Sequence, residues 1–226
     1  MKRPNNTVTA TFSLAFSGGF CDAVTFVVIT GMFSAHVTGN FIEFAKDLVI
    51  GADFDHYAKL VVFPVFIVAV MTGGRMLRLL ANPLVVLLAE GGLLLLCGTV
   101  DLVNNIFGGG IYHTDYWLAL GVVFAMGLQN AFGKVFGGSL HGSTTVMTGN
   151  VTQFSLELAD FLFERSIDKA VVQRLAQSAV SVVGFLAGAL FGTLGAKVSG
   201  IAAVCFPALI VILLGRIHGR IETRKK

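Results

Sequence analysis

The sequence is poor in charge and in cysteine. Asp, Glu, Lys and Arg together make up 13% of its 226 residues, whereas hydrophobic residues make up 55%. Because roughly a quarter of the residues in soluble domains are charged, this composition excludes an ordinary soluble domain. The mean hydropathy of +0.81 agrees with this interpretation. We therefore predict an all-α integral membrane protein that forms one polytopic domain over residues 1–226.

The motifs that the sequence lacks exclude several kinds of chemistry. The three cysteines, Cys21, Cys97 and Cys205, lie far apart, without the spacing of a disulfide framework or a zinc site. No HExxH or GxSxG motif is present, and the three glycines at 108–110 lack the lysine of a phosphate loop. We expect no enzymatic activity, no metal and no cofactor. The net charge of +3 is spread along the chain, which argues against nucleic acid as a partner.

Long apolar windows are abundant. A membrane-spanning helix needs about 20 predominantly apolar residues. Six windows approach or exceed this length, and the last of them is short: 10–33, 59–80, 83–104, 116–137, 174–196 and 199–214. We predict six transmembrane helices, and eight spans are the alternative if two short amphipathic stretches also cross the bilayer.

The basic residues indicate an orientation. With six spans, 13 of the 16 Lys and Arg residues fall on the side that holds both termini. Lys and Arg are enriched in cytoplasmic loops, so we expect both termini to face the cytoplasm. Eight spans would still leave 12 of the 16 on that side. The charge distribution therefore leaves the number of spans open.

One tripeptide occurs twice. Thr38-Gly39-Asn40 matches Thr148-Gly149-Asn150 at an offset of 148 − 38 = 110, close to half the chain length. Asp47 matches Glu157 at the same offset. We interpret this as an internal duplication, with repeats at approximately 8–105 and 114–215. Three spans in each half would make the repeats inverted, as in many transporters, and four would make them parallel.

The repeated tripeptide suggests two interpretations. Gly-Asn before a helix suits a chain break followed by a helix N-terminus, whose free N–H groups favour an anion or a carbonyl. Two such termini facing each other would form a binding site for a solute or an ion. The alternative is a pair of structural helix caps, each stabilising its helix by about 1 kcal/mol. The duplication indicates that both copies of the tripeptide serve the same local geometry, but it does not decide between a binding site and a pair of caps.

Polar residues inside the apolar windows are further candidates. Asp22 lies near the middle of the first window, where an acid costs about 2.5–3.5 kcal/mol, so we expect it to face the protein interior with a partner. Its role is either proton or cation coupling, or locking helices together. Glu90 lies equally deep in the third span. Gln129 and Asn130 could hydrogen-bond across helices or bind a solute. Asn130 is a weaker repeat counterpart of Asp22, matched to it if two residues are gapped.

The segments "GGFCDAVTFVVITGMFSAHVTGN" and "MGLQNAF" followed by "TTVMTGN" resemble the two signatures of the YoaK-like family of bacterial inner-membrane proteins, a domain-of-unknown-function family (DUF1275). The resemblance covers nearly the whole chain. It implies a small multi-pass protein of the bacterial inner membrane, with no established substrate. The motif positions that it carries over are Asp22, Thr38, Gly39, Asn40, Gln129, Asn130, Thr148, Gly149 and Asn150.

A transporter or channel for an unidentified small solute is the function that we favour. It accounts for the duplication, the intramembrane acids and the lack of a sizeable soluble domain. We expect alternating access about a central site formed by the tripeptides, with Asp22 changing charge, and a homodimer would suit the small size. A non-transport interaction or sensor subunit is the alternative, and a membrane-embedded enzyme is a weaker one. The basic segment 216–226 more simply anchors the chain to anionic lipid of the bilayer.

Overall fold

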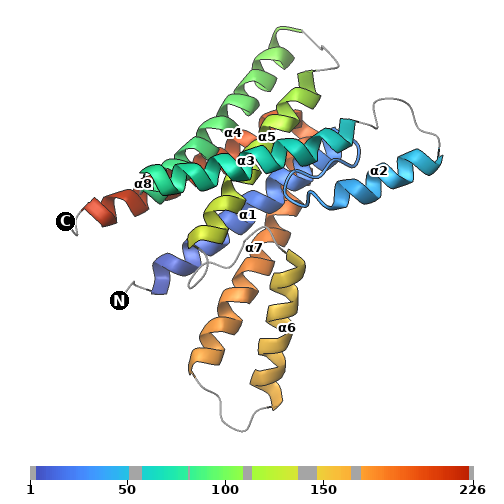
Figure 1. Ribbon diagram of the computed structural model, residues 1–226. Helices are drawn as coiled ribbons and strands as arrows, with labels where there is room; N and C mark the ends of the chain where they lie inside the picture. Colours follow the sequence, from blue (N-terminus) through green and yellow to red (C-terminus); the bar gives the residue numbers. More distant parts are fainter. Residues whose placement is uncertain are drawn as a thin grey trace.

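The computed structural model describes residues 4–50, 58–80, 82–108, 114–136, 147–163 and 169–223. All regular structure in these residues is helical, so the all-α prediction is confirmed (Figure 1). The helices are α1 (Pro4–Val28), α2 (Gly39–Ile50), α3 (Ala58–Leu80), α4 (Pro83–Ile106), α5 (Thr114–Phe136), α6 (Met147–Phe163), α7 (Lys169–Ser199), the 3-10 helix η2 (Gly200–Val204) and α8 (Cys205–Thr223).

Five apolar helical segments are long enough to cross a membrane. Four of them coincide with α1, α3, α4 and α5. The fifth, Ala170–Ile217, is 48 residues long and contains α7, η2 and α8. At 1.5 Å per residue, α2 and α6 are about 18 and 26 Å long, shorter than a hydrocarbon core of about 30 Å. The apolar helices therefore define a multi-pass membrane fold.

The first apolar window ends earlier than predicted. The sequence pattern indicates a helix as far as residue 33, but α1 ends at Val28. Thr30 and Gly31 have φ angles of 32° and 88°, in the left-handed region that stops a helix. The chain then runs without regular structure until α2 begins at Gly39. Hydropathy could not reveal this break because the residues after it are still apolar.

Helix α1 packs against α7 along a face of small residues. A Cβ at Gly184, Gly188 or Gly192 would meet, in that order, the backbone carbonyls of Phe12, Phe16 and Phe20. The contacts advance together along both chains, so the two helices run parallel. The spacing of four residues keeps the glycines on one face and lets the backbones approach closely.

Two other helix pairs complete the bundle. A Cβ at Gly127 of α5 would meet Ala69 of α3, and one at Gly73 would meet Ala131, so these helices also run parallel. Helices α4 and α8 pack in opposite directions. Gly91 meets Ala208 near the middle of their contact, and this contact is flanked by Gly98 with Cys205 and by Leu88 with Gly215.

The buried clusters show how the helix ends are arranged. One cluster, at what we call the first end, joins the starts of α1 and α4 to the ends of α3, α5 and α8, through Ala10, Val86, Leu77, Phe132 and Leu214. The other cluster, extending to the second end, joins the ends of α1, α4 and α7 to the starts of α3, α5 and α8, through Val24, Cys97, Ala196, Val62, Ala119 and Val204. Helices α1, α4 and α7 therefore run one way, and α3, α5 and α8 run the other.

The reversal between α7 and α8 is held by an acid from α4. Gly200, the first residue of η2, has a φ of 61°. The Ala202 amide donates to Oδ2 of Asp101 at 2.7 Å, and Nδ2 of Asn105 donates to the same oxygen at 3.3 Å. Because Asp101 is buried, its carboxylate satisfies a backbone donor that water cannot reach.

Each short helix lies beside the helix that follows it in the chain. Helix α2 packs against α3, and α6 runs along the first part of α7, below the other helices in Figure 1. Buried polar pairs fix both contacts. Nζ of Lys59 is 2.8 Å from Oδ2 of Asp47, while Ser178 donates its hydroxyl to Glu157.

Replacing Gly188 by Ala tests the close α1 and α7 packing. The new Cβ would overlap the Phe16 carbonyl, and relieving such overpacking typically costs about 1–3 kcal/mol. We expect Gly188→Ala to lower the thermal stability of the purified protein. Gly92→Ala is the matched control, because nothing lies within 4 Å of its Cβ and Ala favours a helix. Equal stabilities of the two variants would contradict the packing.

Candidate functional site

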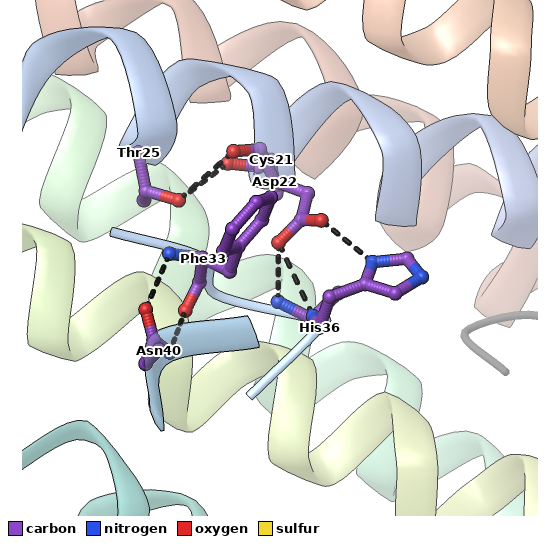
Figure 2. Close-up of polar contacts among 7 residues, drawn as sticks. Cys21, Asp22, Thr25, Phe33, His36 and Asn40 are labelled. Atoms are coloured by element: carbon purple, nitrogen blue, oxygen red, sulfur yellow. Dashed lines mark hydrogen bonds and ion pairs between the residues drawn. The ribbon is translucent and has the colours of Figure 1, made fainter. Parts of the chain in front are cut away.

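Two sets of polar residues lie inside the bundle. The first surrounds the break after α1, where backbone N–H and C=O groups lose their helical partners. An unpaired polar group in apolar surroundings costs several kcal/mol, so side chains must supply the missing hydrogen bonds. Asp22 and Asn40 do so in Figure 2. We call residues 33–37 together with these two side chains the helix break.

Asp22 ties the helix break to α1. Its Oδ1 accepts hydrogen bonds from the backbone amides of Ala35 and His36, at 2.7 and 3.3 Å. Its Oδ2 is 2.7 Å from Nδ1 of His36 (Figure 2). Only 4% of Asp22 is exposed, so these contacts replace water around its carboxylate. Both oxygens of this acid are therefore engaged in holding the chain.

His36 closes the break on the side of α7. Its ring packs edge-on against Phe185 of α7, with the ring centroids 5.1 Å apart. The hydrogen bond that His36 donates to Asp22 and the negative charge of the Asp22 carboxylate raise the pKa of His36 above its usual value of 6.5, against the opposing effect of burial. About 30% of the His36 side chain is exposed. The imidazole can therefore exchange protons with the surroundings while it remains bonded to Asp22.

Two residues of the first tripeptide, Gly39 and Asn40, contact Phe33. Oδ1 of Asn40 accepts from the Phe33 amide at 2.8 Å, and Nδ2 of Asn40 donates to the Phe33 carbonyl at 2.9 Å. A Cβ at Gly39 would collide with the Phe33 ring. Asn40 therefore bonds both backbone groups of one residue before the helix, which differs from the cap expected in α2. Thr38 is exposed.

The second tripeptide makes a different contact. Thr148, Gly149 and Asn150 lie in the first turn of α6, and Nδ2 of Asn150 donates to Oγ of Ser181 on α7 at 3.0 Å. Thr148 and Gly149 are exposed. Residues 137–146, which precede the motif, lie outside the described residues.

The two tripeptides bond different parts of the chain. Ser181, which holds Asn150, lies one turn before Gly184, and Gly184 packs on Phe12 of α1. The first tripeptide is bonded to Phe33 in the break held by Asp22, and His36 of that break packs on Phe185, one turn after Ser181. The site expected between paired helix N-termini stays a prediction.

The second set of buried polar residues includes Glu90 on α4. Glu90 has 0% exposure, and neither carboxyl oxygen has a hydrogen-bond partner among the described residues. Leu87 and Leu94, one turn to either side, are buried in the core. The next residue, Gly91, lies where α4 meets α8. Glu90 thus occupies the interior of the bundle as an acid without a counter-charge.

Residues from α1 and α5 share this interior. Nε2 of Gln129 donates to the Leu14 carbonyl of α1 at 2.9 Å. Ser17 follows Leu14 by one turn on the same face, and its buried Oγ has no partner among the described residues. Cys21, one turn further, lies within electrostatic range of Glu90. We call Ser17, Cys21, Glu90 and Gln129 the central cluster.

The structure thus divides the predicted site residues. Asp22 and Asn40 belong to the helix break, whereas Glu90 and Gln129 belong to the central cluster. Asn130 is half-buried beside Gln129 on α5. Sequence reasoning missed Ser17. Its usable signal was a spacing of seven residues, or two helical turns, from Ala10, which places both residues on the interior face of α1. Among the described residues, no group of three or more His, Cys, Asp or Glu side chains is placed to hold a metal ion.

Comparison with known proteins assigns the chain to a family. A multi-pass helical membrane protein is the class that the apolar helices define. The chain belongs to the family described as "Protein of unknown function (DUF1275)", whose model matches residues 10–217, and this confirms the resemblance noted from the sequence. No curated protein and no solved structure matches the chain.

The Asp22 and His36 contact predicts a pH-dependent break. Because the pKa of His36 is raised in the fold, its stabilising charge is fully present below the ordinary value of 6.5 and is lost as pH rises through the raised pKa. We expect hydrogen-exchange protection of the Ala35 and His36 amides to fall over that interval. His36→Ala should remove the step. The same pH dependence in His36→Ala, or protection that rises with pH, would contradict the prediction.

Proposed function

We propose that this protein moves a small solute across the bacterial inner membrane, as a transporter or channel, through the central cluster. The observation that carries the proposal is Glu90, a wholly buried acid whose two oxygens lack partners among the described residues. Acids inside membrane helices are costly, and they usually mark substrate or ion pathways. The structural acids of this chain, by contrast, hold named backbone or side-chain partners.

Helix directions support six spans in two inverted halves. The helices of the first half would be α1 to α4, and their counterparts α5 to α8. Helices α1, α4 and α7 run one way and α3, α5 and α8 the other, so each long helix runs opposite to its counterpart. This is the relation expected for inverted repeats with three spans each, whereas parallel repeats would give equal directions.

Reciprocal contacts also support the duplication. The first long helix of each half packs in parallel on the third helix of the other half, as α1 with α7 and α5 with α3. The contact of Gly98 with Cys205 has its mirror in that of Leu88 with Gly215. The buried acids Asp47 and Glu157, which are repeat counterparts, each bond the neighbouring third helix.

The enclosure of Glu90 favours alternating access over an open pore. A side chain with no exposure is closed to both membrane faces in this conformation. Inverted halves can rock about their common contact, which here is the α4 and α8 crossing at Gly91 and Ala208. Such rocking would open the central cluster to one side at a time. The small-residue contacts provide smooth surfaces for that motion.

The proposed topology makes a labelling prediction. Phe107 follows α4 at the second end and Val135 lies near the end of α5 at the first end, and both are exposed. With six spans and cytoplasmic termini, we expect a membrane-impermeant maleimide to label Phe107→Cys in intact cells and Val135→Cys only after permeabilisation. Wild-type protein gives the baseline from the native thiols. Eight spans would exchange the two results.

Solute transport is tested with purified protein in proteoliposomes. Small metabolites are first screened by thermal shift, and flux is then followed for each stabilising compound. We expect Glu90→Gln to reduce that flux about tenfold or more, which corresponds to roughly 1.4 kcal/mol of lost stabilisation. Asp160→Asn, at an exposed position of α6, should retain it. Wild-type flux in well-folded Glu90→Gln, or the absence of any transported compound, would remove the support for the proposal.

A further inference from the structure

The buried acids of the described chain differ in one respect. Four of them bond a donor that stabilises the carboxylate: Asp22 with Ala35 and His36, Asp47 with Lys59, Asp101 with Ala202, and Glu157 with Ser178. Glu90 is the most deeply buried, and its oxygens are without such a donor in this part of the chain. A hydrogen-bonding or packing role explains the first four acids, but it does not explain Glu90.

The surroundings of Glu90 disfavour a carboxylate anion. An unpaired charge in a protein interior costs several kcal/mol, much more than the neutral carboxyl group. The nearest titratable neighbour on α1 is the Cys21 thiol, and Cys97 and Cys205 lie further toward the second end. Of the basic residues on the helices packed on α4, four are exposed: Arg75, Arg78, Lys134 and Arg216. Lys59 of α3 is buried, but its ammonium group is paired with Asp47. No cation therefore compensates a negative Glu90 within the described bundle.

We propose that Glu90 is a proton-binding site that is loaded in this conformation, and that its proton is the coupling ion of the transporter. The role of this proton as the coupling ion rests on the proposed function, whereas the proton-binding site itself rests on the burial and missing partners of Glu90 alone. In the loaded state the carboxyl O–H bond is intact. When the cluster opens to water on one face, that bond breaks, the proton passes to water and the carboxylate is left.

The neighbouring residues suit both steps of this cycle. The buried Ser17 hydroxyl and the Glu90 carboxyl are not bonded to each other in this conformation, and neither has another partner among the described residues. When the cluster opens, the Ser17 hydroxyl would be a donor available to the carboxylate, which would limit the cost of releasing the proton. Cys21 lies within electrostatic range of both Glu90 and Asp22, and Asp22 is bonded to the partly exposed His36. These groups form a polar strip from Glu90 toward the second end. Proton exchange with that face would follow this strip.

Infrared spectroscopy tests the loaded site without a known substrate. The carbonyl stretch of a protonated carboxylic acid is separate from that of a carboxylate, and access of a reagent is not required. At neutral pH we expect this band in the wild-type protein and in Asp160→Asn, and its loss in Glu90→Gln, each checked by size-exclusion chromatography. A wild-type spectrum without the band, or a band that persists in Glu90→Gln, would overturn the proposal.

Isotope labelling gives a second measurement that needs no variant. Carbon-13 in the glutamate carboxyl groups shifts glutamate bands and leaves aspartate bands in place. We expect the protonated band of the wild-type protein to shift, because Glu90 is a glutamate; an unshifted band would assign the proton to an aspartate and refute the site. A shifted band together with an absence of solute flux would leave the proton site standing and refute only the transport function.

Discussion

A buried polar group in this protein must find its partner within the protein, and the architecture depends on that constraint. In an apolar environment the backbone can leave the helix only where side chains accept and donate the freed hydrogen bonds. Asp22 and Asn40 do so after α1, and Asp101 does so between α7 and α8. Each break reverses or redirects the chain. The helix order and directions follow from where these polar side chains stand.

Close helix contact supplies the complementary constraint. Glycines at four-residue spacing bring α7 onto the backbone of α1, and single glycines do the same between α3 and α5 and between α4 and α8. These contacts place the helix backbones close together, so packing holds this part of the bundle. In the proposed inverted arrangement, the third helix of each half packs against the first helix of the other half. Polar side chains therefore hold the chain at its breaks, whereas glycine packing holds the helices against one another. The central cluster lies in the interior of the bundle.

The contrast between Asp22 and Glu90 separates structure from function. Both are buried acids in apolar helices, and from the sequence Asp22 is the stronger candidate for a group that changes charge. The fold surrounds Asp22 with two backbone amides and an imidazole, but it surrounds Glu90 mainly with apolar side chains. A carboxylate with three contacts is a structural anchor. Glu90, which has no partner among the described residues, is instead suited to bind a ligand, and the smallest such ligand is a proton.

Composition and spacing by themselves determined the membrane class, the approximate helices and the chain break at the first tripeptide. These properties depend on local apolar runs and on the short reach from Asn40 to Phe33. Only the tertiary structure decided that α1 stops at Val28, that the two tripeptides bond different partners and that Ser17 and Glu90 are buried without partners among the described residues. Whether a buried polar group is satisfied depends on residues far away in the sequence. Hydropathy and internal repeats carry no information about such long-range partners.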